Sequence, residues 1–186
     1  IVVTASHNPA EDSGYKVYGS DGTQIRPPVD QEIESLMDFS DLPGEEDLAS
    51  QEEVEYLSGS AAVAGYIENV VPSNTSRKSE LPVPQWVYTP LCGVGGATME
   101  AACTNAGFPL PVRVDAQFEP NGLFPDLPFP NPEEPGVLDA ALAVADAHDA
   151  ELVLANDPDG DRLAVAIKVG VEWHQLTGDE LGLLLC

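Results

Sequence analysis

The sequence predicts an α/β fold in which helices pack on the faces of a sheet. Between residues 85 and 169, short apolar runs typical of strands alternate with longer segments whose apolar residues have a helical spacing. Turns rich in Gly and Pro separate these segments. The chain has 186 residues, of which 43% are hydrophobic, and this is enough to bury a core.

The first third of the chain is expected to form two short strands, two helices and a linker. An apolar run predicts a strand of the buried kind, and alternating residue types after a polar turn predict a second strand. Two later segments have a helical spacing, the second stopped by residues 72–74, and the stretch between them is rich in acidic residues. In chain order, these elements lie at residues 1–3 (strand), 14–18 (strand), 29–39 (helix), 38–55 (linker) and 61–71 (helix).

The remaining residues predict the alternating strands and helices of one α/β domain. A Gly-rich turn at 93–96 opens a helix, and a segment crowded with Pro, Asn and Gly at 117–135 predicts a long irregular loop. Such a loop in a compact domain is usually functional. Strands are expected at 85–89, 112–115, 152–155 and 163–169, and helices from the Gly-rich turn to about 106, at 137–148 and from 178 onward.

The composition restricts the partners of the protein. The formal net charge is −25, from 32 acidic residues against 7 Lys and Arg, so a nucleic-acid backbone or an anionic membrane surface is a poor partner. Three cysteines without a C-x-x-C pair predict reduced thiols. No apolar run approaches the ~20 residues of a membrane helix. We therefore expect a cytoplasmic protein, and the sequence leaves its oligomeric state open.

Asp157, Asp159 and Asp161 alternate in a short segment between two apolar strands, where Pro158 and Gly160 supply the bend. Three carboxylates so close together repel one another without a counter-ion. Ligands that are all oxygen select Mg²⁺ or Ca²⁺ over Zn²⁺. With three carboxylates offered, the ion keeps positions for water and a phosphate oxygen, as Mg²⁺ does in phosphoryl-transfer sites. The segment therefore predicts a magnesium site.

Other interpretations of this aspartate loop stay open on the residues alone. It could be an acidic turn without function, at the cost of charge repulsion. It could belong to a Mg²⁺-dependent phosphatase of another fold, with Asp157 or Asp159 as nucleophile. It could also belong to a calcium-stabilised binding module without chemistry. An EF-hand loop starting at Asp157 would, however, need Gly and Glu where the chain has Arg162 and Lys168.

Ser6 and His7 lie in a polar turn that follows the first predicted strand. A hydroxyl beside an imidazole on such a turn is suited to nucleophilic chemistry, although serine in a turn is more often a turn former or a helix cap. Lys16 lies in the second predicted strand. Next to a phosphorylated serine, its ammonium could offset charge or carry a proton.

Two motifs stand far apart in the chain: Ser6-His7-Asn8-Pro9 with Gly14-Tyr15-Lys16, and Asp157-Pro158-Asp159-Gly160-Asp161-Arg162. In this order they resemble the α-D-phosphohexomutase family, the phosphoglucomutases and phosphomannomutases. The likeness includes residues 88–95, 129–133 and 176–180. The amino-acid sequence at 14–18 and 24–25 is most similar to the phosphoglucomutase and phosphopentomutase branch of the family. Cys92 departs from the pattern, because such proteins often have His there.

The resemblance implies an isomerase that moves a phosphoryl group on a hexose or pentose phosphate. Ser6 would carry the phosphoryl group and donate it to the sugar, giving a bisphosphorylated sugar that returns its other phosphate to Ser6. Either His7 or Lys16 would serve as acid and base. The serine turn and the aspartate loop would then share one cleft. The catalytic residues implied are Ser6, His7, Lys16 and Arg162, and the Mg²⁺ ligands implied are Ser6, Asp157, Asp159 and Asp161.

The resemblance also implies that the chain is a fragment of a four-domain phosphohexomutase. Residues 1–59 would be the C-terminal part of the first domain with a linker, 60–177 the second domain, and 178–186 the start of the third. The residues that select the sugar would lie outside the chain, so the substrate stays open among glucose, mannose, pentose and amino-sugar phosphates. For the same reason we expect the isolated chain to be inactive, because remote binding energy would be missing.

Overall fold

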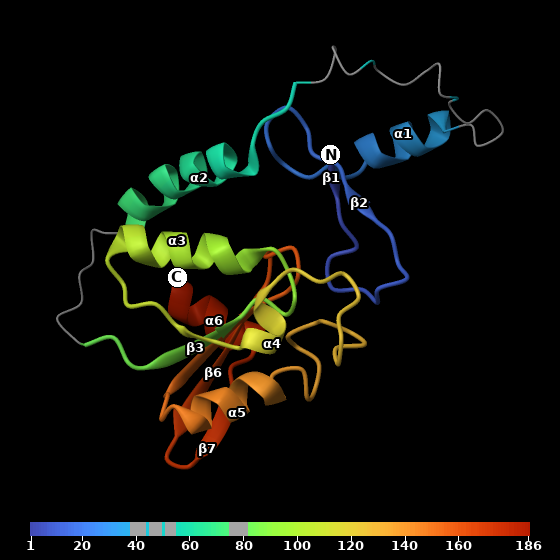
Figure 1. Ribbon diagram of the computed structural model, residues 1–186. Coiled ribbons are helices and arrows are strands. Elements are labelled where there is room, and N and C mark those ends of the chain that lie inside the picture. Colours follow the sequence, from blue (N-terminus) through green and yellow to red (C-terminus); the bar gives the residue numbers. More distant parts are fainter. Residues whose placement is uncertain (38–43, 45–49, 51–54, 75–81) are drawn as a thin grey trace.

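The computed structural model of the chain confirms the α/β class (Figure 1). It describes residues 1–37, 44, 50, 55–74 and 82–186. These residues form a small two-stranded sheet near the N-terminus and a five-stranded sheet with helices on both faces. Most of the linker expected at 38–55 lies outside the described residues.

The elements follow one another as strands and helices in the order that Figure 1 labels. The strands are β1 (Val2–Val3), β2 (Tyr15–Lys16), β3 (Trp86–Thr89), β4 (Val112–Arg113), β5 (Leu152–Asn156), β6 (Leu163–Val169) and β7 (Glu172–Gln175). The helices are α1 (Val29–Leu36), α2 (Gly59–Asn74), α3 (Gly95–Ala106), α4 (Asp115–Phe118), α5 (Asp139–Ala147) and α6 (Gly178–Leu185).

The larger sheet is mixed, with the strand order β4-β3-β5-β6-β7. Strand β3 pairs in parallel with β4 and β5, whereas β6 is antiparallel to both β5 and β7. The β5–β6 pair ends with Asn156 opposite Leu163, so the aspartate loop is the tip of this hairpin. Its carboxylates therefore emerge at the same edge of the sheet as the carboxyl end of β3.

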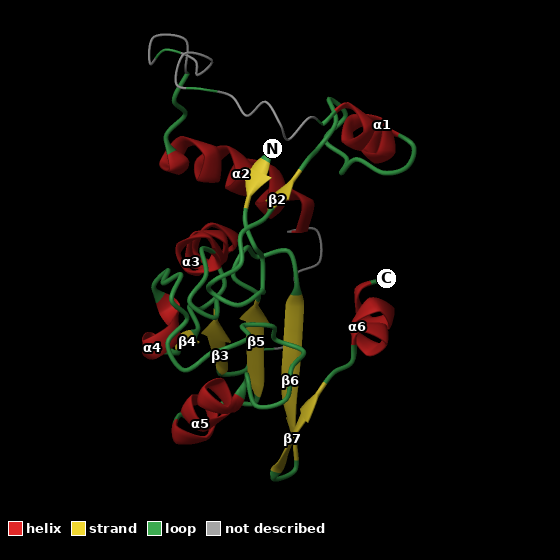
Figure 2. Ribbon diagram, turned by 90° about the vertical axis from the view of Figure 1, so that its right-hand side faces the viewer, coloured by secondary structure: helices red, strands yellow, loops and turns green. Residues whose placement is uncertain are grey.

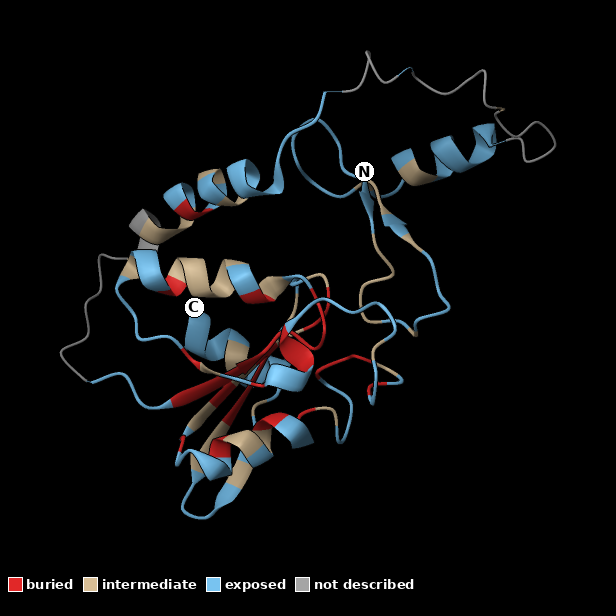
Figure 3. Cartoon of the chain, viewed as in Figure 1, coloured by how far each residue is buried: buried red, intermediate tan, exposed pale blue. Residues whose placement is uncertain are grey.

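The core of the domain lies on both faces of β3 and β5. Val87 and Val153 pack with Ala141 and Ala145 of α5 on one face. The neighbouring strand residues pack on the other face with Phe118 and with side chains of α3. Figure 1 shows α3 and α5 on opposite sides of the sheet, and Figure 3 shows buried residues concentrated along its central strands. All four residues of β3 are buried because both faces are covered.

Several predicted elements are confirmed with small shifts at their ends, whereas two elements were not predicted. Strand β7 and the short helix α4 were missed, the latter because its residues were assigned to the end of a strand and the start of a loop. The helix stop predicted at residues 72–74 is confirmed, since α2 ends at Asn74, although the helix extends three residues past the predicted end at 71. A proline inside a helix lacks a backbone N–H and removes one helical hydrogen bond, and α2 ends two residues after Pro72.

The N-terminal strands form a separate hairpin in which Val2 pairs with Lys16 and Val3 with Tyr15. The prediction of a buried strand is wrong for the described residues, since Val3 is 86% exposed. A strand is buried only where a second layer packs on it, and β1 has β2 as its neighbour in a two-stranded sheet. Figure 2 shows this hairpin beyond the end of β5 and β6, with the turn between its strands approaching them.

The Gly-rich turn after β3 packs directly on the aspartate loop. The backbone N–H of Val94 donates to the carbonyl of Pro158 at 2.9 Å. A Cβ atom at Gly93 would overlap the backbone of Pro158, so glycine is required for this close approach. The first turn of α3 and the tip of the β5–β6 hairpin are thereby held together.

We expect Gly93→Ala to lower the free energy of unfolding by about 2 kcal/mol, because the added methyl group forces the two backbones apart. Gly122→Ala is the matched control, since a Cβ at Gly122 would meet nothing within 4 Å. Chemical denaturation of both variants measures the difference. Equal stability of the two variants would show that the turn and the loop are not in close contact.

Candidate functional site

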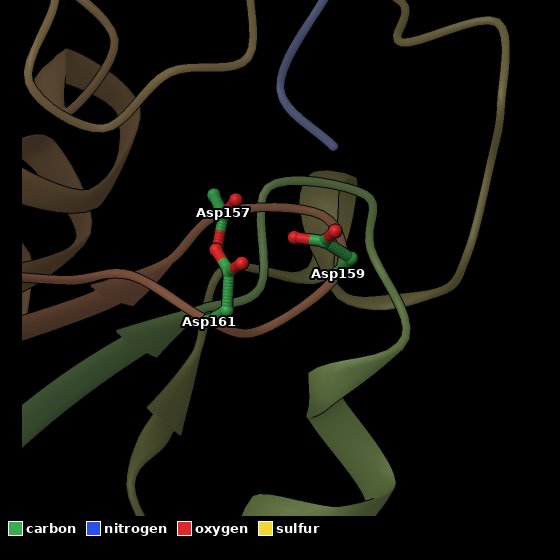
Figure 4. A group of neighbouring side chains, drawn as sticks. All are labelled: Asp157, Asp159 and Asp161. Carbon is green, nitrogen blue, oxygen red and sulfur yellow. The ribbon is translucent and has the colours of Figure 1, made fainter. Parts of the chain in front are cut away.

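The aspartate loop brings three carboxylates together at the tip of the β5–β6 hairpin. One oxygen atom from each of Asp157, Asp159 and Asp161 lies within 4.8 Å of the others, and Figure 4 shows the three side chains converging. Within the described part of the chain, this is the one group of His, Cys, Asp or Glu residues close enough to hold a metal ion. Gly160 closes the turn with a φ of 76°, and its N–H donates to the carbonyl of Asp157.

The serine turn reaches the aspartate loop across a long separation in sequence. The Oγ of Ser6 donates to Asp157 Oδ2 and to Asp159 Oδ1, each at 3.0 Å. The two motifs therefore meet as expected, and Ser6 and Asp159 line one pocket together. Ser6 has a φ of 56°, and its N–H donates to Thr4 Oγ1 at 2.8 Å. The backbone of Ser6 thus has a left-handed conformation that few serines adopt.

His7 and Lys16 both lie beside this hydroxyl. The Nδ1 of His7 is 3.1 Å from Ser6 Oγ, and its ring packs edge-on against Phe129. Lys16 Nζ donates to Asp159 at 2.7 Å and to Asp161 at 2.5 Å. These hydrogen bonds raise the pKa of Lys16, so the ammonium stays charged at neutral pH.

Arg162 contributes to the site through its backbone and its side chain separately. Its N–H donates to Asp157 Oδ1 at 2.9 Å, which fixes one carboxylate oxygen. Its guanidinium lies 3.8 Å from Glu133 and 3.4 Å from Asn131, and does not contact Ser6. It nevertheless lines a pocket of about 330 Å³ together with Ser6. The predicted catalytic residues Ser6, His7, Lys16 and Arg162 all line this pocket, together with Asp161.

The two inner carboxylates have pKa values shifted in opposite directions. Burial raises the pKa of Asp157, which is fully buried, and the nearby charge of Asp159 adds to this. Burial also acts on Asp159, but hydrogen bonds from Lys16, Asp157 and Ser6 outweigh it and lower the pKa of Asp159. Asp159 is therefore the carboxylate of the pair whose ionised form is favoured, and Lys16 pairs with it.

The arrangement fits a hard divalent cation. Its donors are three carboxylates and a hydroxyl, all oxygen, which suit Mg²⁺ or Ca²⁺. The buried carboxylate of Asp157 is costly without positive charge nearby, and Lys16 compensates only Asp159 and Asp161. The residues present therefore fit a metal ion held by the predicted ligands.

Some residues of the site were not predicted from the sequence. Thr4 accepts the N–H of Ser6 and donates to Asp159 Oδ2 at 3.3 Å, so it links the two motifs. A Thr two residues before a turn serine is a known turn signal and could have been used. Asn131 lies in the 129–133 stretch that carries the family likeness, but no local pattern predicted its contact with Arg162, which depends on how the 117–135 loop folds. Cys92 is buried and lies in a second pocket that also touches Ser6.

Two protein-family models match the chain. The model described as phosphoglucomutase/phosphomannomutase, alpha/beta/alpha domain II, matches residues 64–170, and the corresponding domain I model matches residues 1–42.

Relatives and a solved structure show the same likeness. A probable phosphomannomutase of Haemophilus influenzae is 39% identical over all of the chain, and a phosphoribomutase of Saccharomyces cerevisiae is 38% identical over 99% of it. The chain covers 38% and 32% of these proteins, so it spans about a third of their length. A crystal structure of a phosphoglucomutase/phosphomannomutase family protein from Burkholderia thailandensis covers 89% of the chain, with a TM-score of 0.58 and 27% identity, and the match spans 32% of that protein.

Among the described residues, no helix has both the length and the apolar character needed to cross a membrane.

We expect Asp157→Asn to raise the free energy of unfolding without metal at pH 7 by about 1 kcal/mol, the usual size of a single-residue effect. The folded state raises the pKa of Asp157, so the ionised carboxylate costs stability above that pKa, and stability falls as the pH rises through it. The difference between variant and wild type should vanish below the ordinary Asp pKa of about 3.9.

Thermal unfolding from pH 3 to 8 with EDTA measures this difference, and saturating Mg²⁺ should reverse its sign. Asp126→Asn, an exposed aspartate outside the site, is the control. A variant that is less stable than wild type throughout this range would contradict the assignment of a buried, repelled carboxylate.

Proposed function

Because this chain belongs to the phosphoglucomutase/phosphomannomutase family, we propose that it forms part of an isomerase that moves a phosphoryl group on a sugar phosphate. One observation carries the proposal: the Ser6 hydroxyl lies within hydrogen-bond distance of Asp157 and Asp159, although about 150 residues separate them. A nucleophile placed against a carboxylate cluster is the arrangement that cation-assisted phosphoryl transfer needs.

In the proposed reaction, Ser6 carries the phosphoryl group in the resting protein. The P–Oγ bond of phosphoserine breaks as a free sugar hydroxyl attacks phosphorus, and the proton of that hydroxyl passes to a base. The bisphosphorylated sugar then reverses its orientation in the site. Its other phosphate then returns to the Ser6 Oγ, and the sugar oxygen that it leaves takes up the proton.

His7 and Lys16 are the two candidates for this proton transfer. His7 Nδ1 lies 3.1 Å from Ser6 Oγ, within the reach that a general base requires. The raised pKa of Lys16 supports a role in neutralising phosphate charge while both of its aspartate partners are in place. Arg162, at the rim of the same pocket, adds a second cation for the phosphate.

We propose Mg²⁺ as the metal, held by Ser6, Asp157, Asp159 and Asp161. When bound, Mg²⁺ supplies positive charge that stabilises the developing charge on the transferring phosphoryl group. The oxygen-only donor set supports this choice over zinc. The protein's own contribution is to hold Asp157 through the Arg162 N–H and to orient Ser6 through Thr4.

The proposal includes the domain division 1–59, 60–177 and 178–186, which the separate matches at 1–42 and 64–170 support. It names a sugar phosphate and no particular sugar, because relatives of similar identity carry the names phosphomannomutase, phosphoribomutase and phosphopentomutase. The free thiols of Cys92 and Cys103, both buried, fit the reducing cytoplasm as its location.

Neither alternative from the sequence gains support from the site. An aspartyl-nucleophile phosphatase needs a carboxylate free to attack phosphorus, whereas Asp157 and Asp159 both accept the Ser6 hydroxyl. A calcium-stabilised binding module does not require a serine in a strained backbone conformation beside its metal-binding carboxylates. Both family models that match the chain describe phosphoglucomutase/phosphomannomutase domains instead.

Intact-mass spectrometry of the full-length protein tests the role of Ser6. We expect one phosphate per molecule in the wild type and none in Ser6→Ala, with mutase activity lost by a factor of about 10⁴ or more, since the covalent route is removed. Ser20→Ala, an exposed serine that does not line this pocket, should keep both the phosphate and the activity. A fully active Ser6→Ala protein would end the proposal.

Isothermal calorimetry with Mg²⁺ and Ca²⁺ tests the metal. We expect Asp159→Asn to weaken Mg²⁺ binding by more than about 100-fold, beyond the range usual for groups that only support a ligand. The exposed Asp126→Asn again serves as the control, and Ca²⁺ should bind without supporting turnover. Preference for Ca²⁺, combined with no turnover in Mg²⁺, would favour the binding-module alternative instead.

A further inference from the structure

A partly buried hydrogen-bond network closes the base of the aspartate loop. The hydroxyl of Tyr88 donates to Asn156 Oδ1 at 2.9 Å. The Nδ2 of Asn156 donates to the carbonyl of Arg162 at 2.6 Å, and the N–H of Arg162 donates to Asp157 Oδ1 at 2.9 Å. An unbroken path of three hydrogen bonds therefore runs from the core strand β3 to the most buried carboxylate of the site.

The position of Asn156 explains why this path controls the loop. Asn156 is the last paired residue of β5, opposite Leu163 of β6, and the aspartate loop lies between them. Its side chain bonds across the hairpin to Arg162, so it fastens both ends of the loop. With Oδ1 of Asp157 held by Arg162, the other oxygen, Oδ2, faces the Ser6 hydroxyl at 3.0 Å.

Tyr88 anchors the network in the rigid part of the domain. It is fully buried among Trp86, Cys103 and Phe118, so its ring has little freedom to move. A buried tyrosine hydroxyl needs a hydrogen-bond partner, and Asn156 is the partner in this structure.

The start of α3 leaves room for this hydroxyl. A Cβ atom at Gly95 would lie 2.8 Å from the Tyr88 hydroxyl and 4.0 Å from Asn156 Oδ1. Glycine is a poor helix former, yet it is the first residue of α3. The space needed by the Tyr88–Asn156 pair accounts for it.

We propose that Tyr88 and Asn156 are positioning residues of the metal site. They touch neither the nucleophile nor the pocket that Ser6 and Arg162 line, and they act by fixing the aspartate loop in the shape that aims Asp157 at Ser6. The proposal rests on the proposed function, because it assigns the network a role in the affinity of the carboxylates for a divalent cation. Hydrogen-bond partners that lie behind metal ligands typically change metal affinity by about 10–100-fold when removed.

The test measures Mn²⁺ binding to the full-length protein by electron paramagnetic resonance, which counts the free ion directly. We expect Tyr88→Phe, which removes one oxygen atom, to raise the Kd for Mn²⁺ roughly tenfold. The matched control is Trp86→Phe on the same strand. Trp86 packs in the same core cluster and donates one hydrogen bond, to Pro109 at 3.3 Å, which lies outside the aspartate loop.

Activity against metal concentration gives a second readout. In Tyr88→Phe, the Mg²⁺ concentration for half-maximal activity should rise about tenfold, while the rate at saturating Mg²⁺ stays close to that of the wild type. Asn156→Leu is similar in size and removes both side-chain hydrogen bonds without adding a charge beside the aspartate loop, so it should weaken Mn²⁺ binding at least as much. This variant decides the question if Tyr88→Phe does not fold.

Each result separates the inference from the function on which it rests. Weaker Mn²⁺ binding in Tyr88→Phe and Asn156→Leu, with unchanged binding in Trp86→Phe, supports the positioning role. Unchanged binding in Tyr88→Phe, or an equal loss in Trp86→Phe, overturns it. If Asp159→Asn also binds Mn²⁺ as the wild type does, the metal site itself is wrong, and the proposed function fails together with the inference.

Discussion

Repulsion among the carboxylates of the aspartate loop is the constraint on which the rest of the site depends. Three negative groups within 4.8 Å of one another, one of them fully buried, are stable only if donors and cations surround them. The structure supplies the Ser6 hydroxyl, the Arg162 N–H and the Lys16 ammonium. Each of these groups also has a place in the proposed phosphoryl transfer, so the demands of folding and of chemistry coincide.

The scaffold meets this constraint by holding the loop from several directions. The mixed order of the sheet puts a hairpin tip beside the carboxyl end of β3, where the Gly93 turn touches Pro158. The serine turn approaches from a separate hairpin and reaches the loop through side-chain hydrogen bonds of Thr4 and Ser6. The aspartate loop is therefore held by the scaffold of the sheet, and the serine turn is brought to it.

The sequence predicted the parts of the site that have a local signature. Alternating carboxylates between apolar strands indicate a metal loop whatever the fold, and β6 was placed without error because its apolar run is bounded by turn residues. The meeting of Ser6 with that loop came from the resemblance to a family, since no local pattern encodes a contact across 150 residues. Tyr88 was not predicted to matter, because a tyrosine in an apolar strand looks the same whether its hydroxyl supports a site or merely finds a partner.

The two hydrogen bonds of Lys16 have a consequence for the proposed metal site. The ammonium already neutralises part of the charge on Asp159 and Asp161. A divalent cation at the proposed site would therefore either share these two carboxylates with Lys16 or replace it. In both cases the affinity for the cation would be lower than three uncompensated carboxylates would give.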